Sequence, residues 1–198
     1  MAITRYRRVR TEVVGRFPFF EVERHDVEAD DAARARHDAY TMRLSDWVSI
    51  AAVTADEQFV LIRQHRHGVD AVTIEVAGGV VDAGEAPLEA ALRELREETG
   101  YAGESAEALG FVHPNAAMAD NRCFLFLARG VREAGPTECD AFESTEPFTM
   151  TRAEVEAALA GGAISHAPTV IALTRALLAL DRGDSAGAGR DRGAARGG

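Results

Sequence analysis

Three glutamates, Glu94, Glu97 and Glu98, fall within a short segment that has the apolar spacing of a helix. Residues at positions i, i+3 and i+4 of a helix share one face, so the three carboxylates are expected side by side. Carboxylates this close repel one another unless a cation lies among them. Because no His or Cys stands nearby, oxygen atoms alone would surround that cation, which favours Mg²⁺ or Mn²⁺ over zinc. The segment therefore predicts a divalent-metal site.

The element that must position these glutamates is a helix predicted over residues 87–99. Pro87 suits the first helical turn, where its missing N–H costs nothing. Gly100 suits the left-handed position just past the last turn. The expected apolar face consists of Leu88, Ala91, Leu92 and Leu95.

The loop before this helix carries Gly78, Gly79 and Gly84, which let its backbone turn tightly and approach a ligand. We expect the carbonyl of Gly78 to be a further metal ligand. A divalent ion in this place would make hydrolysis of a diphosphate feasible, because it polarises a phosphoryl oxygen and lowers the pKa of a bound water. The alternative is an ordinary polar helix face held by Arg–Glu pairs. The fixed spacing of glycine, glutamate and arginine favours the metal site over that alternative.

The spacing resembles the signature box of the Nudix hydrolases at each defined position, which are Gly79, Glu85, Arg93, Glu94, Leu95, Glu97, Glu98, Gly100 and Tyr101. The resemblance implies an α/β/α sandwich with a mixed sheet. It also implies an enzyme that uses a divalent metal to cleave a nucleoside diphosphate linked to another moiety. In such an enzyme Glu94, Glu97 and Glu98 bind metal, and Glu97 and Glu98 are also catalytic candidates.

Segments flanking the box resemble ADP-ribose and nucleotide-sugar pyrophosphatases. They include TIEVAGG at residues 73–79 and LIRQHRHGVD at residues 61–70. The resemblance implies Mg²⁺-dependent hydrolysis of the pyrophosphate bond, giving a nucleoside monophosphate and a sugar phosphate. It assigns substrate binding to Arg66, which would grip the diphosphate, and to Trp47, Pro114 and Gly79. A surface charge at Arg66 and a half-buried Trp47 at a strand end are the structural alternatives.

The resemblance also implies a general base or an extra metal ligand outside the box, in the run FESTEPFTMT, where Glu146 is the best match and Glu143 the second. An acidic surface loop is the alternative, and Glu97 could serve as the base instead. The histidines His65, His67, His113 and His166 have no ligand spacing, and we expect surface or structural roles for them. Two different activities also stay open: hydrolysis of oxidised nucleoside triphosphates, and a non-catalytic domain that senses nucleotide sugars.

The 198 residues predict one α/β domain with an arm at each end. Residues 1–45 are β-prone, and the resemblance implies an arm that is exchanged across a homodimer and completes the nucleoside pocket. Residues 46–181 form the expected catalytic domain, with a β-hairpin over 48–66 and helices over 152–159 and 168–180. The Gly/Ala/Arg-rich residues 182–198 are expected to be disordered.

The composition limits which partners the protein can bind and in which cell compartment it is expected. A formal net charge of −10 argues against a nucleic-acid-binding surface. No apolar run approaches the roughly 20 residues of a membrane helix, and no secretory signal is apparent. The two cysteines, Cys123 and Cys139, give no disulfide framework and no metal spacing. We therefore expect a cytoplasmic protein with a small nucleotide-sugar substrate.

Overall fold

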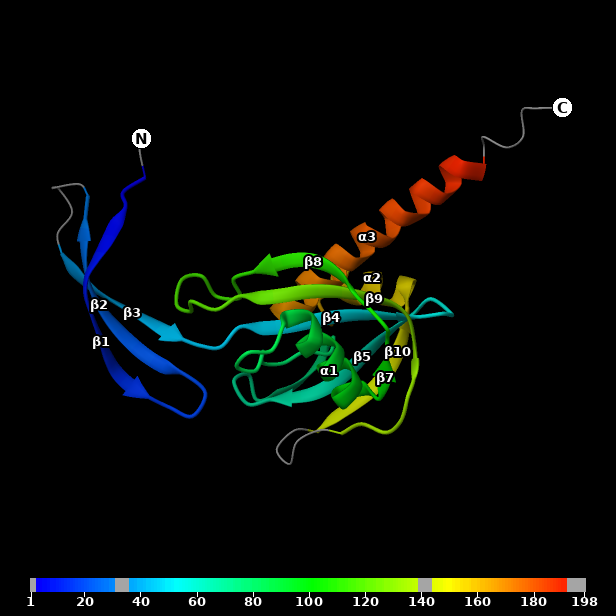
Figure 1. Cartoon of the computed structure of the whole chain (residues 1–198), viewed down its shortest axis with the longest axis horizontal. Coiled ribbons are helices and arrows are strands. Elements are labelled where there is room, and N and C mark those ends of the chain that lie inside the picture. Colours follow the sequence, from blue (N-terminus) through cyan, green and yellow to red (C-terminus); the bar gives the residue numbers. More distant parts are fainter. Residues whose placement is uncertain (1–2, 31–35, 139–143, 192–198) are drawn as a thin grey trace. The chain divides into compact units, whose positions relative to one another are not determined.

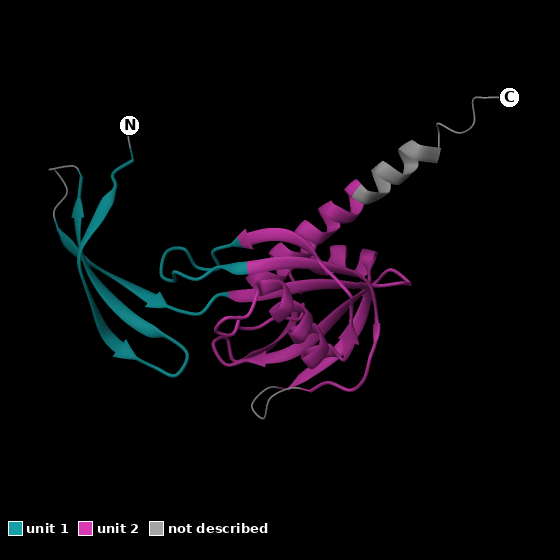
Figure 2. Ribbon diagram, in the orientation of Figure 1, with its two compact units in different colours: residues 1–46, 112–123 teal, residues 47–111, 124–198 magenta. Residues whose placement is uncertain are grey.

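The computed structural model describes residues 3–30, 36–138 and 144–191, with side chains described as far as Arg182. The chain forms two compact units, which Figure 2 shows in different colours. The first unit contains residues 1–46 and 112–123, and the second contains residues 47–111 and 124–198. Residues 112–123 therefore belong with the N-terminal arm, although they lie within the predicted catalytic domain.

The second unit is built on a seven-stranded sheet in the order β10-β5-β4-β9-β7, with β6 paired to β5 and β8 paired to β9. Its strands are β4 (Trp47–Thr54), β5 (Gln58–Arg66), β6 (Ala71–Glu75), β7 (Tyr101–Ala102), β8 (Glu107–Val112), β9 (Cys123–Glu133) and β10 (Thr145–Thr151). The predicted hairpin is confirmed, because β4 and β5 pair as antiparallel neighbours. The predicted α/β class with a mixed sheet is also confirmed.

Three helices cover the sheet: α1 (Pro87–Thr99), α2 (Arg152–Ala160) and α3 (Ala167–Asp191). Figure 1 shows α1 in front of the strands and α3 behind them. The predicted bounds of α1 are confirmed, whereas α3 continues ten residues beyond the predicted catalytic domain, to Asp191. The residues after Leu180 extend a helix that has already started, since each added residue gains a hydrogen bond. No helix within the described residues is long and apolar enough to span a membrane.

The core between α1 and the sheet is made of small and branched apolar side chains. Helix α1 contributes Ala90, Ala91 and Leu95, all of them fully buried. The strands contribute Val48, Ile50, Ala52, Val60, Phe126, Ala128 and Val131. Alanines on the helix let it approach the strands closely, and this fixes the height of its polar face above the sheet. Leu88 is exposed, so the buried stripe is narrower than the predicted apolar face.

The first unit contains an antiparallel sheet of β1 (Tyr6–Arg16), β2 (Glu21–Ala29) and β3 (His37–Arg43). Its buried residues among those described in the three strands are His25 and Val27, both on the central strand. Each nitrogen of the His25 ring contacts a threonine hydroxyl, with Thr11 at 2.9 Å and Thr41 at 2.7 Å. The arm therefore has regular strands but almost no apolar core.

Candidate active site

Helix α1 begins at Pro87 and ends just before Gly100, the two residues that mark its ends in the sequence. Ala86 is the N-cap, and its backbone N–H donates to the Glu89 carboxylate at 3.4 Å. Gly100 adopts the left-handed conformation with φ of 74°, and its N–H donates to the Arg96 carbonyl at 2.9 Å. A Cβ at Gly100 would collide with the carbonyl oxygen of Gly135. Glycine is required here both by the backbone angle and by the packed loop.

Arg93 organises the acidic face of α1. Its Nε and Nη2 donate to the two carboxylate oxygens of Glu85, at 2.9 Å and 3.0 Å. Its Nη1 donates to Glu94 at 2.9 Å and to Glu97 at 3.0 Å. The hydrogen bonds that Arg93 donates, first to Glu85 and then to Glu94 and Glu97, raise its pKa against the effect of burial. One guanidinium thus ties the loop before the helix to two of its three clustered carboxylates.

The remaining glutamate, Glu98, is 2% exposed and is held by backbone. One of its carboxylate oxygens accepts the N–H of Gly78 at 2.8 Å. The Glu94 carboxylate lies against the neighbouring Gly79, where an added Cβ would sit 2.6 Å from the carboxylate carbon. The missing side chain of Gly79 therefore leaves the space that Glu94 fills. The buried carboxylates of Glu94 and Glu98 therefore both lie against the Gly78–Gly79 backbone.

The donor set fits a hard divalent cation. Glu94 and Glu98 are one helical turn apart, both are buried, and the Gly78–Gly79 backbone lies beside them. Oxygen ligands of this kind suit Mg²⁺ or Mn²⁺. The described residues contain no group of three His, Cys, Asp or Glu side chains already converged on one point. Two of the helix's carboxylates are instead drawn toward Arg93.

Strand β5 brings further residues to the same side of the sheet as α1. Gln64 pairs with Thr145 of β10, and the Thr145 hydroxyl donates to the backbone carbonyl of Glu98 at 2.7 Å. Side chains alternate along a strand, so Gln64 and Arg66 share the face that Thr145 occupies. The Gln64 side chain is buried, and its Oε1 has no hydrogen-bond partner within the described chain.

Arg66 makes a two-pronged ion pair with Glu75. Its Nε and Nη2 donate to the two carboxylate oxygens at 2.8 Å and 2.7 Å. Glu75 is 1% exposed and also contacts His166 Nδ1 at 2.9 Å. Burial alone would raise the pKa of Glu75, but hydrogen bonds from Arg66, His166 and Thr73 outweigh it and lower the pKa to about 2. This carboxylate is ionised and fully satisfied.

Glu146 lies away from the carboxylates of α1. It pairs with Arg63 across β10 and β5, and its carboxylate accepts from Arg63 Nη1 at 3.2 Å. Thr145 faces α1, so its neighbour Glu146 points to the opposite face of the sheet. The side chain is 72% exposed. The register of β10 thus places Glu146 on the face opposite α1, and its role as the base stays a prediction. Glu143 lies outside the described residues.

Trp47 and Pro114 lie in different units. Trp47 is half-buried at the start of β4, where it forms a bridge with Val80 of the glycine-rich loop. Pro114 belongs to the first unit and lies in the turn that follows β8. In that unit Arg122 donates to Asp46 at 2.7 Å, and this pair lowers the pKa of Asp46 against the effect of burial. Trp47 is thus beside the predicted site, while Pro114 is part of a separate structural unit.

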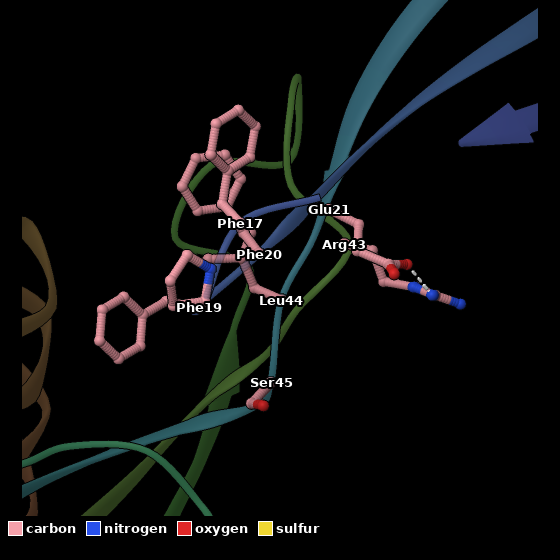
Figure 3. Close-up of a pocket in the computed structure, with 8 residues that line it drawn as sticks. Phe17, Phe19, Phe20, Glu21, Arg43, Leu44 and Ser45 are labelled. Carbon is pink, nitrogen blue, oxygen red and sulfur yellow. Dashed lines mark hydrogen bonds and ion pairs between the residues drawn. The ribbon is translucent and has the colours of Figure 1, made fainter. Parts of the chain in front are cut away.

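The first unit has a hollow of about 380 Å³ at the turn between β1 and β2 (Figure 3). The rings of Phe17 and Phe20 stack with centroids 4.7 Å apart. Phe19 points away from that pair in Figure 3 and is 87% exposed. On the other side of the hollow, Glu21 pairs with Arg43. The tip of the arm therefore exposes aromatic side chains.

Sequence reasoning missed the residues that support the site: Gln64, Glu75, Thr145 and Thr169. His166 was expected to be structural. Glu75 has a visible signal, since it stands in the run TIEVAGG before the box. Its contact with His166, 91 positions along the chain, has no local signal.

Comparisons with known proteins agree with this arrangement. A family model for the NUDIX domain matches residues 44–172. The chain is 26% identical over 166 residues to the methanol dehydrogenase activator of Bacillus methanolicus, covering 83% of this chain and 89% of that protein. It is 32% identical over 81 residues to the ADP-ribose pyrophosphatase of Bacillus subtilis, covering 41% of this chain and 44% of that protein.

A solved structure supports the fold. The crystal structure of an ADP compounds hydrolase superposes with a TM-score of 0.79 at 23% identity, covering 91% of this chain and 97% of that chain. The predicted Nudix architecture is confirmed. With its box from Gly79 to Tyr101 built around α1 and the family match extending over most of its length, the chain belongs to the Nudix hydrolase family.

Proposed function

We propose that this Nudix hydrolase cleaves the pyrophosphate bond of ADP-ribose or a related nucleoside diphosphate sugar. The products would be a nucleoside monophosphate and a sugar phosphate. The observation that carries this proposal is the pair of buried carboxylates, Glu94 and Glu98, against the Gly78–Gly79 backbone. The match to a protein named ADP-ribose pyrophosphatase supports the substrate class.

Glu94, Glu97, Glu98 and the carbonyl of Gly78 would hold Mg²⁺, or Mn²⁺ in its place. When bound, such an ion polarises a phosphoryl oxygen and lowers the pKa of a water. Nudix hydrolases generally use a divalent metal, and the all-oxygen donor set of α1 suits one. Negative charge on the α1 face exceeds what Arg93 alone balances, which favours uptake of a cation.

The chain's own residues bind and orient the substrate. Arg93 holds Glu85, Glu94 and Glu97 in place, so the acidic face is set before the substrate arrives. Arg66, on the same face of the sheet, would grip the diphosphate with its guanidinium. Trp47 would offer its ring to the base, since an aromatic face suits adenine. Glu97 is more accessible than Glu94 and Glu98 and is our candidate to take a proton from the attacking water.

A substrate panel tests this proposal. ADP-ribose, other nucleoside diphosphate sugars and nucleoside triphosphates would be incubated with the protein and Mg²⁺, and products identified by chromatography and mass spectrometry. We expect AMP and ribose 5-phosphate from ADP-ribose. Preferential release of pyrophosphate from triphosphates would replace the proposed substrate class. Tight binding of nucleotide sugars without any cleavage would point to a sensor.

We further propose that the arm of residues 1–45 docks on a second copy of the chain. Every residue of β1 is exposed or half-exposed, and a three-stranded sheet without a buried apolar face is not stable alone. The exposed Phe17 and Phe19 give the arm an apolar tip that a partner would cover. Light scattering should give the mass of a dimer, and deletion of residues 1–45 should give a monomer. A monomeric full-length protein with normal activity contradicts this proposal.

A cytoplasmic location is proposed from the cysteine content of the chain. Its two cysteines, Cys123 and Cys139, are too few to form a disulfide framework. Reduced thiols are usual where glutathione and thioredoxin keep cysteines reduced. Fractionation of cells that express the protein would test this, and recovery from an extracytoplasmic fraction would contradict it.

A further inference from the structure

The guanidinium of Arg66 is fixed along one edge by the Glu75 carboxylate. The two bonds, at 2.8 Å and 2.7 Å, set both the plane and the direction of the guanidinium. The Arg66 side chain is nevertheless 40% exposed, so the guanidinium lies at the surface and not in the core. Its orientation is therefore decided by whatever holds Glu75.

Glu75 is held by one residue that is distant in the sequence, His166, and by one that is near, Thr73. His166 Nδ1 lies 2.9 Å from one carboxylate oxygen, and the Thr73 hydroxyl donates to the other. A carboxylate only accepts hydrogen bonds, so Nδ1 must carry the proton in this contact. The same nitrogen lies 2.9 Å from Thr169 Oγ1, which also accepts the N–H of Val76 at 3.1 Å. The start of α3 is thereby tied to the end of β6.

We propose that His166 is a positioning residue for substrate binding, acting through Glu75 on the guanidinium of Arg66. This inference rests on the proposed function, in which Arg66 grips the diphosphate. Without His166, Glu75 loses one of the donors that compensate its burial, and its carboxylate can rotate toward another partner. The guanidinium then samples several orientations, and ordering it for the diphosphate costs binding energy.

The arrangement differs from an ordinary structural ion pair. Thr169 and Glu75 are fully buried, whereas Arg66, which Glu75 holds, is a half-exposed cation. His166 itself is 28% exposed in its side chain, so replacing it leaves no large internal cavity. Removing it should therefore change substrate binding more than folding.

The test compares KM and kcat for ADP-ribose with Mg²⁺ in His166→Ala, His166→Asn, Arg66→Ala and the double variant. Asparagine places an amide N–H close to the position of Nδ1, so it restores the donor to Glu75. We expect His166→Ala to raise KM about tenfold with a smaller change in kcat, and His166→Asn to recover most of the loss. His65→Ala is the matched control, because His65 precedes Arg66 on β5 and is half-exposed, with Asp70 as its partner. It should leave KM unchanged.

The double variant separates positioning from a general structural effect. If His166 acts through Arg66, His166→Ala should add nothing to the KM of Arg66→Ala. An effect of His166→Ala that persists in full without Arg66 overturns the inference, as does an unchanged KM in His166→Ala alone. A normal KM in Arg66→Ala removes the proposed grip on the diphosphate, and the inference with it. Thermal unfolding of each variant checks that the fold is retained.

Discussion

Two arginine–glutamate centres on the second unit differ in their charge balance. At α1, the single guanidinium of Arg93 donates to the carboxylates of Glu85, Glu94 and Glu97. At the end of β6, the single carboxylate of Glu75 accepts from an arginine, a histidine and a threonine. The first centre has more negative charge than its cation can balance. At the second, one cation faces one anion, and the donors match the acceptor positions of the carboxylate.

The difference in charge balance suits the α1 face to binding a ligand and the Glu75 centre to holding a neighbouring side chain in place. Buried charge is costly unless it is paired, so an excess of carboxylates at α1 favours an incoming cation. The Glu75 centre has no such excess, and its role is to hold Arg66 in one orientation. Arginine and glutamate therefore form a ligand site in one place and a supporting ion pair in the other. The two places differ in the ratio of carboxylates to cations and in how deeply the groups are buried.

The largest effect is expected from Glu98→Gln. The change keeps the shape and the contact with Gly78 N but removes one buried negative charge from the α1 face. We expect kcat for ADP-ribose to fall on the order of 10³-fold, with little change in the unfolding temperature. Glu104→Gln is the control, since Glu104 is 91% exposed and pairs only loosely with Arg132 at 3.4 Å. If Glu98→Gln keeps most of its activity, the excess charge at α1 is not a metal site.

Gly79→Ala should have the next largest effect. The new methyl group would lie 2.6 Å from the Glu94 carboxylate carbon, so Glu94 must move away from the backbone of the loop. We expect a loss of about 10- to 100-fold in kcat, measured under saturating ADP-ribose. Gly68→Ala is the matched control, because a methyl group there meets nothing within 4 Å. Equal activity in both alanine variants would show that the position of Glu94 is unimportant.

Acid should weaken the Glu75 centre in a defined pH window. The folded-state pKa of Glu75 is lowered to about 2, so its contribution to stability is complete above its ordinary pKa and is lost as pH falls toward 2. Wild type should exceed Glu75→Gln by on the order of 3 kcal/mol in free energy of unfolding at pH 7. Urea unfolding at pH 7, 5 and 3 should show this advantage shrinking between pH 5 and pH 3. If the difference in free energy of unfolding between wild type and Glu75→Gln stays constant with pH, the ionised form of Glu75 does not contribute to stability.

The smallest effect is expected from Glu146→Gln. Glu146 pairs with Arg63 on the face of the sheet opposite α1, and exposed ion pairs contribute little to stability. We expect kcat to change by less than about twofold, since the residue does not reach the acidic face of α1. A loss as large as that of Glu98→Gln would support Glu146 as the catalytic base and contradict the alternation along β10.

The sequence predicts the parts of this molecule that depend on local signals. Pro87 and Gly100 mark the ends of α1, and helical spacing places Glu94, Glu97 and Glu98 on one face. The sign and number of charges in the box then indicate a divalent cation. These inferences need no knowledge of the tertiary structure, because every interaction in them spans a few residues.

The parts that the sequence does not predict depend on register and on distant contacts. Whether Glu146 faces α1 is decided by the pairing of Thr145 with Gln64, and a shift of one residue would reverse it. The contact of Glu75 with His166 joins β6 to the start of α3, and no periodicity predicts it. Helix α3 also continues past the expected start of the tail, because each residue added to an existing helix gains a hydrogen bond.

The most direct test of the metal site is calorimetric titration of Mg²⁺ into the protein with a non-hydrolysable ADP-ribose analogue bound. The acidic face of α1 predicts saturable uptake in wild type, strong weakening in Glu98→Gln and normal uptake in Glu104→Gln. Absence of uptake by wild type, or equal uptake by wild type and Glu98→Gln, would contradict the assignment of the buried glutamates of α1 as metal ligands.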